Sequence, residues 1–220
     1  MDAEKLRNTY NQYFSGGKNL WTSNDAEKTI KVAQQTIGWL KKSGFSKLSG
    51  KVLDVGCATG YYTEAFRQLG FTATGLDYAD VAVKQAGINF PQCRFVQMNG
   101  FEPTFNEKFD VIFCRGFSGV NTHDLNFIAS WVNKYVDYLS DGGFFVLGYS
   151  SDFSGTEKEG ETVNLSLVEI DNLAGKIRAE YLSYHIFYYF GLLSRLKRIF
   201  EKRVLGKRVK DYYYLVFRKS

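Results

Sequence analysis

The sequence predicts an α/β fold in which helices cover both faces of a mostly parallel sheet. Short apolar runs alternate with segments of helical periodicity, which is the pattern of strands joined by crossover helices. A glycine-bearing turn follows the first of these runs, at VLDVGCATG (52–60). The run DYYYLVFRK (211–219) has the aromatic and apolar content of a further strand near the C-terminus.

The individual elements follow from local patterns taken in chain order. Helices are predicted over residues 4–14 and 25–43, and in the second of these apolar residues recur at intervals of three and four. Strands are predicted at residues 51–56, 71–77, 93–99, 109–115 and 144–150. Helices are expected between them at residues 61–69, 80–86 and 124–139. Asp141-Gly142-Gly143 is expected to turn the chain into the fifth strand.

The alternation stops after Ser150, where a polar stretch predicts a loop. A short helix is expected over residues 166–175, because Ser166 is a favourable N-cap and Gly175 a favourable end. Residues 176–190 fit an extended segment followed by a helix, and the pattern does not separate the two.

Composition limits the class of protein. The 220 residues are 45% apolar, which is enough for one core, and no stretch reaches the roughly 20 apolar residues that span a bilayer. The N-terminal MDAEKLRNTY lacks the apolar core of a secretory signal. Three widely spaced cysteines fit a reduced cytoplasm and predict neither a disulfide framework nor a metal site. We therefore expect a cytoplasmic protein.

Positive charge is concentrated near the C-terminus. Residues 176–220 hold 12 Lys or Arg and 3 Asp or Glu, whereas the other 175 residues hold 16 and 20. Within this part, LLSRLKRIFEKR (192–203) has apolar residues at helical spacing. A solvated basic helix is one interpretation. The other is a surface that attracts the phosphates of a substrate or a membrane.

The turn after the first strand is the natural ligand site of an open α/β sheet. Gly56 and Gly60 allow the backbone to turn sharply and approach a ligand, and Ala58 keeps the loop narrow. Asp54 ends the first strand and is expected to face the crevice, and Asp77 ends the second. A carboxylate at the second position can accept hydrogen bonds from both hydroxyls of a ribose. These residues predict a nucleoside-binding site.

A dinucleotide site is the main competitor. Its fingerprint is G-x-G-x-x-G, which presents backbone amides to a pyrophosphate. The sequence GCATG has only G-x-x-x-G, and Asp54 precedes it. An acid facing the ligand favours a cationic ligand, such as an amine or a sulfonium, over a phosphate. A nicotinamide-dependent oxidoreductase is therefore disfavoured.

These motifs, in this order, resemble those of the class I S-adenosylmethionine-dependent methyltransferases. VLDVGCATG is similar to the family's first motif, acid-x-Gly-x-Gly-x-Gly, with Ala58 in place of the middle glycine. GLDY (75–78) resembles the second motif and VQMNG (96–100) the third, where Asn99 replaces a common aspartate. FDVIFCRG (109–116) and LSDGGFFVLGYS (139–150) resemble the fourth and fifth strands.

The resemblance implies a Rossmann-like class I methyltransferase fold, with a mostly parallel seven-stranded sheet and an antiparallel last strand. It implies S-adenosylmethionine as the cofactor, S-adenosylhomocysteine as the product, and no metal. The cofactor-binding residues implied are Asp54, Gly56, Cys57, Ala58, Gly60, Asp77, Tyr78, Asn99, Gly100 and Arg115. Asp77 would bind the ribose, Tyr78 would lie beside the adenine, and Asn99 could accept from the adenine amino group through its carbonyl oxygen.

The implied reaction is an in-line methyl transfer to an oxygen or nitrogen nucleophile of a small molecule that could carry a sugar or phosphate. A base is needed only when the nucleophile starts protonated. His123 and His185, the two histidines of the chain, are the candidate catalytic bases, with Tyr149 and Asp152 as further candidates. A helix cap or a surface contact is the competing interpretation of each histidine. A non-catalytic S-adenosylmethionine-binding regulatory or partner protein is the alternative function.

The chain as a whole, 1–220, is expected to be a single domain. Residues 1–44 would form a helical lid, and residues 151–205 an acceptor-side insertion with the basic helix. The acceptor wall is expected from residues 1–21, which include Tyr10, Tyr13, Phe14 and Trp21, and from residues 151–190. The short chain favours a small-molecule substrate over a nucleic acid. Peripheral membrane contact remains a hypothesis, and the sequence indicates no particular oligomeric state.

Overall fold

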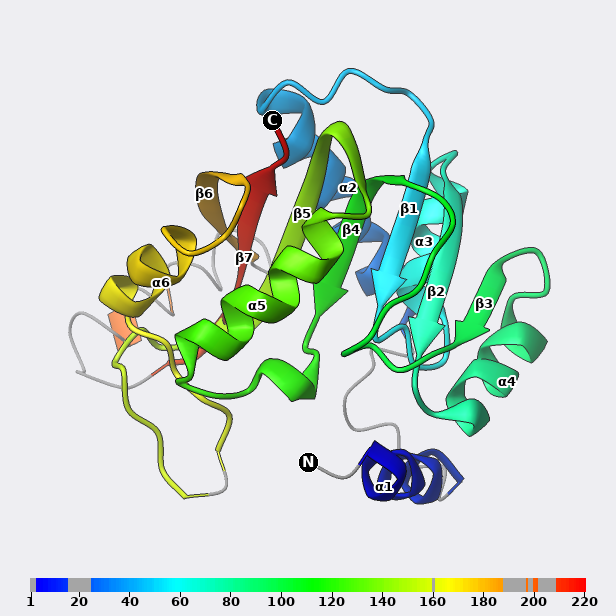
Figure 1. The fold of residues 1–220 in the computed structure, drawn as a ribbon, viewed down its shortest axis with the longest axis horizontal. Helices are drawn as coiled ribbons and strands as arrows, with labels where there is room; N and C mark the ends of the chain where they lie inside the picture. Colours follow the sequence, from blue (N-terminus) through cyan, green and yellow to red (C-terminus); the bar gives the residue numbers. More distant parts are fainter. Residues whose placement is uncertain (1–2, 16–24, 160, 188–196, 198–199, 202–208) are drawn as a thin grey trace.

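The fold is that of a computed structural model, which describes residues 3–15, 25–159, 161–187, 197, 200–201 and 209–220. Its centre is a sheet with the strand order β3-β2-β1-β4-β5-β7-β6 (Figure 1). The strands are β1 (Lys51–Val55), β2 (Thr72–Asp77), β3 (Arg94–Gln97), β4 (Phe109–Arg115), β5 (Leu139–Ser151), β6 (Glu180–Phe187) and β7 (Asp211–Arg218). The pairs among β3, β2, β1, β4 and β5 are parallel, and β7 is antiparallel to both β5 and β6.

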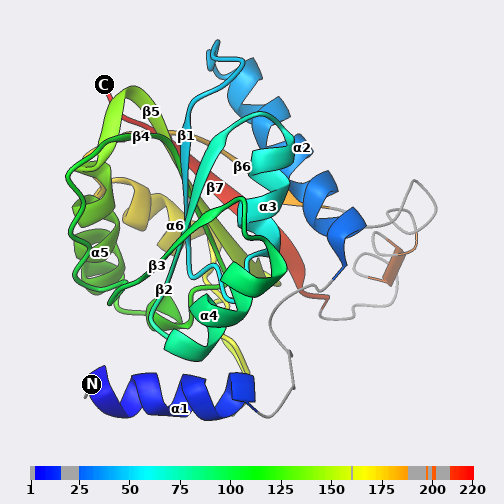
Figure 2. The same cartoon turned by 90° about the vertical axis from the view of Figure 1, so that its right-hand side faces the viewer.

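Helices cover both faces of this sheet, as the sequence predicts. The described helices are α1 (Ala3–Ser15), which lies apart from both faces, α2 (Ala26–Lys42), α3 (Tyr61–Gln68), α4 (Asp80–Asn89), α5 (Leu125–Val136) and α6 (Leu167–Ala174), with a short 3₁₀ turn η1 (Ser118–Val120). Figures 1 and 2 place α5 and α6 on one face and α2 and α3 on the other. Because β4 is covered on both sides, its residues from Phe109 to Cys114 are all buried.

The two faces carry separate apolar cores. Leu53, Ile112 and Phe145 of the sheet pack with Trp131 and Tyr135 of α5 in one core. The other core joins the opposite face of the strands to α2 and α3, through Val32, Leu40, Phe66, Phe113 and Val216. The sheet is thus held rigidly from both sides, which fixes the positions of its strand ends.

Helix α1 does not pack on either face of the sheet. It lies across the carboxyl ends of the parallel strands (Figure 2). Asn11 ties it to the start of α4: its Nδ2 donates to the Asp80 carboxylate, and its Oδ1 accepts from the Val81 N–H at 3.3 Å. The helix therefore stands over the edge where an open α/β sheet binds its ligands.

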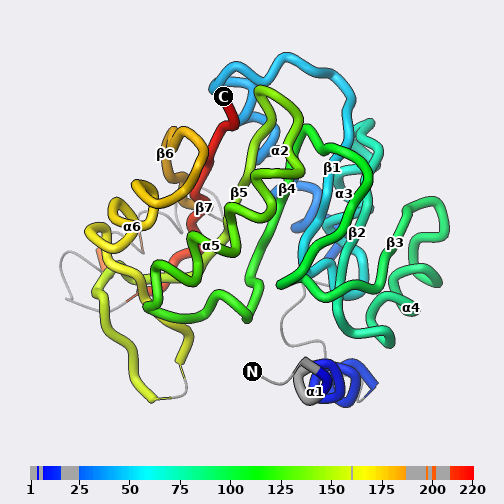
Figure 3. The backbone as a smooth tube through the Cα atoms, in the orientation of Figure 1, coloured from blue at the N-terminus to red at the C-terminus, as the bar shows by residue number. Residues whose placement is uncertain are grey.

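Several boundaries differ from the sequence expectation. The strand expected at residues 144–150 begins at Leu139, so the predicted turn at residues 141–143 lies within β5. Gly142 has a φ of +70° there, and the Gly142 N–H donates to the Lys219 carbonyl at 3.1 Å. Leu139 is paired with Phe109 of β4, so the strand begins there, and Figure 3 shows the segment beside the C-terminal residues. Helix α4 runs on to Asn89, and α5 ends at Val136.

After residue 150 the structure confirms some of the predicted elements, and others lie outside the described residues. Helix α6 begins with a capping box in which Ser166 and Glu169 cap each other's backbone N–H groups, as the predicted Ser cap requires. Residues 180–187 are extended, as β6. The predicted basic helix at residues 192–203 lies outside the described residues except for Lys197, Phe200 and Glu201. Among the helices that are described, none has the length and apolar character to cross a membrane.

Candidate active site

The turn between β1 and α3 is built from residues in left-handed conformations. Gly56, Ala58 and Gly60 have φ angles of +75°, +48° and +89°. The N–H groups of Gly56 and Cys57 both donate to the Leu76 carbonyl, at 2.8 and 2.9 Å, which folds the turn over the end of β2. A glycine at position 60 is also needed for space, because a Cβ there would lie 2.7 Å from the Phe95 ring.

A cavity of about 330 Å³ lies between this turn and α1. Eight of the ten residues predicted to bind the cofactor line it: Gly56, Cys57, Ala58, Asp77, Tyr78, Asn99, Gly100 and Arg115. They come from the ends of four neighbouring elements of the sheet edge, so the carboxyl-end rule places them together although they span 60 positions of the sequence.

Asp77 is held in one orientation at the end of β2. Its Oδ2 accepts from the Ala58 N–H and its Oδ1 from the Ala79 N–H, both at 2.9 Å. Burial raises the pKa of Asp77, and these two backbone hydrogen bonds counteract that effect. Each carboxylate oxygen has a second lone pair, so the group can accept two further hydrogen bonds from a ligand.

Asp54 and Gly60, the other two residues predicted to bind the cofactor, do not line the cavity, and their contact with the cofactor stays a prediction. The Asp54 side chain is buried beneath the turn, with 2% of the residue exposed, and accepts from the Thr63 hydroxyl at 2.7 Å. Burial raises the pKa of Asp54 to about 7, against the lowering effect of the Thr63 hydrogen bond. Asp54 therefore anchors the first turn of α3 through its hydrogen bond with Thr63. Gly60 is the N-cap residue of the same helix.

Hydrogen bonds from side chains of α5 hold the loop after β3 in place. Trp131 Nε1 and the Tyr135 hydroxyl both donate to the Gly100 carbonyl at 2.7 Å. The Asn99 Oδ1 accepts from the Phe101 N–H at 3.0 Å. This bond orients the Asn99 amide, whose carbonyl oxygen has a second lone pair to accept from a ligand and whose NH₂ is a donor.

Aromatic side chains form most of the remaining wall. Tyr10, Tyr13 and Phe14 contribute from α1, as predicted, and the Tyr10 hydroxyl forms a hydrogen bond with Ser118 of η1. Trp21 lies outside the described residues, and no described residue between 151 and 190 lines the cavity. Helix α1 therefore spans the opening from α4 to η1 and closes it with aromatic rings.

The sequence analysis missed three rings of the wall, Tyr62, Phe101 and Phe117. Phe117 stacks on Trp131, with ring centroids 4.8 Å apart and an interplanar angle of 8°. The available signal was position: Phe117 follows the end of β4 after one glycine, and Phe101 lies in the loop after β3, so each lies near the carboxyl edge.

Arg115, the last residue of β4, brings a positive charge to the cavity. Its guanidinium lies over the Tyr212 ring, 3.8 Å from the ring centroid, and 5.2 Å from the centroid of Tyr62. Its Nε donates to the Tyr214 hydroxyl at 2.9 Å. The contacts with the two rings and the hydrogen bond fix the plane of the guanidinium.

Comparison with known proteins relates this geometry to a family. Residues 52–143, which contain the turn and the ends of β1, β2, β3 and β4, match the family model described as a methyltransferase domain. These residues are a methyltransferase domain.

A relative supports this assignment. An uncharacterized methyltransferase from Synechocystis is 35% identical over 103 residues, which cover 44% of this chain and 45% of that protein. The matched segment thus spans less than half of the relative's length.

Solved structures extend the similarity of fold beyond the methyltransferase domain. An S-adenosylmethionine-dependent methyltransferase from Clostridium acetobutylicum superposes with a TM-score of 0.67 at 14% identity, over 96% of this chain and 99% of that one. A Burkholderia thailandensis 1,6-didemethyltoxoflavin-N1-methyltransferase gives 0.66 at 16% identity, over 99% and 88%. The magnesium protoporphyrin IX methyltransferase of Synechocystis gives 0.65 at 12% identity, over 100% and 98%.

Neither predicted catalytic histidine lines the cavity of the methyltransferase domain. His123 Nδ1 is 2.6 Å from Glu169 and its Nε2 3.1 Å from Glu157, and these hydrogen bonds raise the pKa of His123, that to Glu169 most. His185 stacks on Trp39, with centroids 4.6 Å apart, and burial lowers its pKa. The structure therefore gives both histidines structural contacts, in agreement with the competing interpretation.

The two further candidates also lie outside the cavity lining. The buried Tyr149 hydroxyl donates to the Val120 carbonyl at 2.6 Å. The Asp152 carboxylate accepts from the Ser154 N–H at 2.9 Å in the loop after β5. Among the described residues, no group of three or more His, Cys, Asp or Glu side chains is placed to hold a metal ion.

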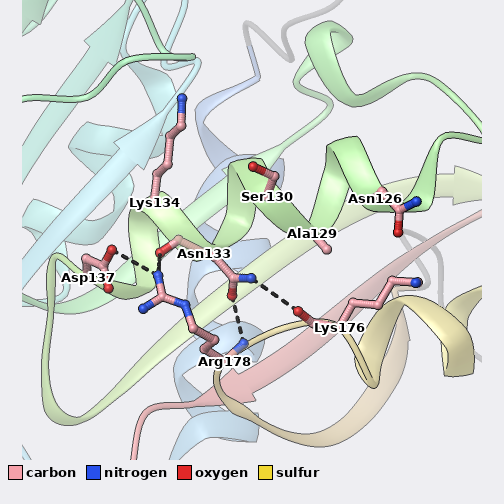
Figure 4. Close-up of a pocket in the computed structure, with 8 residues that line it drawn as sticks. All are labelled: Asn126, Ala129, Ser130, Asn133, Lys134, Asp137, Lys176 and Arg178. Carbon is pink, nitrogen blue, oxygen red and sulfur yellow. Dashed lines mark hydrogen bonds and ion pairs between the residues drawn. The ribbon is translucent and has the colours of Figure 1, made fainter.

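A second, shallower hollow of about 500 Å³ lies on the outer face of α5 (Figure 4). Three of its charged side chains pair within the protein: Arg178 pairs with Asp137 at 2.9 Å, and Lys134 pairs with Glu102 at 2.6 Å. The Asn133 amide bridges the Lys176 carbonyl and the Arg178 N–H. These contacts hold the loop after α6 against α5. The hollow shares no lining residue with the cavity under α1.

Proposed function

We propose that the protein transfers a methyl group from S-adenosylmethionine to a small-molecule acceptor. The observation that carries the proposal is the cavity lined by the glycine turn, by the half-buried Asp77 carboxylate and by the aromatic side chains of α1. The match of residues 52–143 to the methyltransferase domain supports it. So do the structures of similar fold, since the Synechocystis and Burkholderia enzymes were crystallised with S-adenosylmethionine and S-adenosylhomocysteine, respectively.

The residues of the cavity fit the cofactor. Asp77 has acceptor capacity for the two ribose hydroxyls, and Tyr78 and the Asn99 amide lie where the adenine would follow. Gly56 brings backbone to the cavity surface without a side chain, and a Cβ there would lie 3.3 Å from the Phe117 ring. The bound cofactor would supply an activated methyl group on a sulfonium.

The chain's contribution to the reaction is positioning and exclusion of water. A nucleophile must be held in line with the bond that breaks, and fixing that geometry supplies much of the rate. Helix α1, tied to α4 by Asn11 and to η1 by Tyr10, closes the cavity over the reacting groups. The side chains that surround the acceptor are mainly aromatic, and such rings pack against flat faces.

A flat ring system is therefore the acceptor that we favour. The Burkholderia neighbour, crystallised with 1,6-didemethyltoxoflavin, and the magnesium protoporphyrin IX methyltransferase have ring substrates by name and support this choice. A phosphate-bearing acceptor is the second candidate. It is supported by a Haemonchus contortus phosphoethanolamine N-methyltransferase, which has a TM-score of 0.59 over 84% of this chain and 52% of that one.

Two measurements test the proposal. Calorimetric titration with S-adenosylhomocysteine should give a one-to-one complex, and a folded protein that shows no binding would remove the proposed function. Turnover is then assayed with isotopically labelled S-adenosylmethionine against flat heteroaromatic and phosphate-bearing acceptors. Tight cofactor binding with no transfer to any of them would favour the alternative of a non-catalytic S-adenosylmethionine-binding protein.

A further inference from the structure

The ring of Phe117 lies where three loops of the cavity wall meet. A Cβ built on any of three glycines would come close to this ring: 3.3 Å away at Gly56, 3.1 Å at Gly100 and 2.7 Å at Gly119. The first glycine follows β1, the second lies in the loop after β3, and the third belongs to η1. Because none of them carries a Cβ, the backbones of all three loops can approach the same ring. One aromatic side chain therefore lies against three separate segments of the wall.

Trp131 of α5 fixes the orientation of that ring. Its indole stacks on Phe117, with centroids 4.8 Å apart and an angle of 8° between the planes. Its Nε1 donates to the Gly100 carbonyl at 2.7 Å, and only 2% of Trp131 is exposed. Because a buried side chain in a close-packed core has little room to move, the ring and the loop after β3 are held by one rigid support.

The residue after Phe117 receives the helix that closes the cavity. Ser118 forms a hydrogen bond with the Tyr10 hydroxyl of α1. The end of η1 is held from the interior, because the Tyr149 hydroxyl donates to the Val120 carbonyl at 2.6 Å. Since one planar peptide unit joins Phe117 to Ser118, the position of the ring sets the position of the hydroxyl to which α1 is bonded.

We propose that Phe117 is a positioning residue that couples occupation of the cofactor site to the docking of α1. The inference rests on the proposed function, in which the loops that contain Gly56 and Gly100 hold S-adenosylmethionine. A ligand that fixes these two loops also fixes the ring between them, and with it Ser118. The docked state of α1 is then favoured when the cofactor is bound, and by linkage the docked helix strengthens cofactor binding. The protein thus completes the aromatic wall for the acceptor after the cofactor has bound.

Hydrogen exchange of α1, measured by mass spectrometry with and without saturating S-adenosylhomocysteine, tests this coupling. In the wild type the ligand should slow exchange in residues 3–15 roughly ten-fold, which is a usual size for coupling between linked sites. Phe117→Leu keeps an apolar side chain but loses the flat ring against which the three loops lie. This variant should still bind S-adenosylhomocysteine in calorimetry, and the slowing in α1 should fall below about two-fold.

The outcomes separate coupling through the ring from direct contact between ligand and helix. Equal slowing in the wild type and in Phe117→Leu would mean that the ligand holds α1 without the ring, and would overturn the proposal. The proposal also fails if S-adenosylhomocysteine binds the wild type without slowing exchange in α1, or if Phe117→Leu no longer binds it, since Phe117 would then be a binding residue. A folded wild type that does not bind S-adenosylhomocysteine instead overturns the proposed function, so the two failures are distinguishable.

Matched controls separate coupling from a general loss of packing. Phe127→Leu removes a ring of α5 that lies 6.0 Å from the Phe101 ring and does not line the cavity, and it should keep the wild-type response. Residues 26–42 of α2 are the internal control, because none of them lines the cavity and their exchange should not respond to the ligand.

A second variant keeps the test decisive if Phe117→Leu does not fold. Trp131→Phe retains a ring behind Phe117 but loses the hydrogen bond to the Gly100 carbonyl, so the ring and the loop after β3 no longer share one support. The slowing of exchange in α1 should fall in this variant as well. A response equal to that of the wild type would overturn the proposal.

Discussion

Asp54, which is buried, and Asp77, which is half-buried, lie near the ends of adjacent strands, and their partners give them different roles. The Asp54 carboxylate accepts from a side chain beneath the turn, whereas the Asp77 carboxylate is held by backbone N–H groups at the cavity wall. Since only Asp77 lines the cavity, only its replacement should reach the ligand directly.

We expect Asp77→Asn to weaken S-adenosylhomocysteine binding by about 1–3 kcal/mol, because charge-assisted hydrogen bonds to two hydroxyls are lost. Asp54→Asn is the matched comparison. It should change the affinity much less, because this substitution alters the hydrogen bond between Asp54 and Thr63 and no contact with the ligand. Calorimetry of both variants checks this. An equal loss in the two would mean that the ribose lies elsewhere.

Gly56 and Gly70 allow backbone strain to be separated from contact with the ligand. Both have positive φ angles, +75° and +90°, but only Gly56 lines the cavity. Alanine at either position should cost about 1–2 kcal/mol of unfolding free energy, because both force a Cβ into the left-handed region. Only Gly56→Ala should weaken S-adenosylhomocysteine binding. Denaturant unfolding and calorimetry measure the two effects, and a loss of affinity in Gly70→Ala would contradict the assignment.

Helix α1 is the element that converts an open strand edge into a closed cavity. Its described side-chain ties to the rest of the protein include Tyr10 to Ser118 and Asn11 to the start of α4. Removing these two ties should free the helix without removing it, and so separate closure from folding.

The double variant Tyr10→Phe/Asn11→Ala should release S-adenosylhomocysteine about ten-fold faster, because each lost hydrogen bond contributes about 0.5–1.5 kcal/mol to the closed state. Gln12→Ala, an exposed position of the same helix, is the control and should not change the rate. Stopped-flow displacement measures it. If both variants release the ligand at the wild-type rate, α1 does not gate the cavity.

His123 joins three segments: the loop that contains η1, the loop after β5 and the start of α6. It faces Glu169 and Glu157, whose hydrogen bonds raise its pKa from the ordinary value of 6.5. A raised pKa in the folded state means that His123 stabilises the fold fully below pH 6.5, and that this stability is lost as the pH rises through the folded-state pKa. The pKa of Glu157 is lowered by His123, so its contribution is lost only in acid.

The difference in melting temperature between wild type and His123→Ala should therefore be larger at pH 6 than at pH 8.5. His185→Gln is the comparison with the opposite sign, because burial lowers the pKa of His185 and its protonation disfavours the fold. Differential scanning fluorimetry across this range checks both. A His123→Ala difference that does not vary with pH would contradict the ion-pair description.

The sheet and the cofactor loop could be predicted from sequence because they follow local rules. Runs of apolar residues marked the parallel strands, and the carboxyl-end rule placed Asp77 and Asn99 at one edge. The orientation of the Asp54 side chain could not be predicted, because no local pattern shows that the Thr63 hydroxyl of α3 donates a hydrogen bond to the Asp54 carboxylate. The contact of Arg115 with Tyr214 joins residues 99 positions apart, and only the placement of β7 beside β5 brings them together.

At the scale of the whole molecule, the charge asymmetry of the sequence predicts attraction to anionic surfaces. Residues 176–220 carry 12 basic and 3 acidic side chains, and the apolar-aromatic run IFYYFGLL (186–193) lies among them. The full-length protein should co-sediment with phosphatidylserine-containing vesicles at low salt, and an interfacial helix would retain that binding at physiological salt. Phosphatidylcholine vesicles are the control, and no sedimentation at either salt would remove the membrane hypothesis.

The antiparallel pairing of β7 between β5 and β6 bears on how the protein is made. Until residues 211–218 leave the ribosome, β5 is an exposed edge strand, and its apolar segment FFVLGY is open to pairing with other chains. The residues that match the methyltransferase domain therefore emerge before the strand that covers the neighbouring edge of β5. Truncation near the C-terminus should produce aggregating protein, and a nascent chain should need a chaperone until its last strand is inserted.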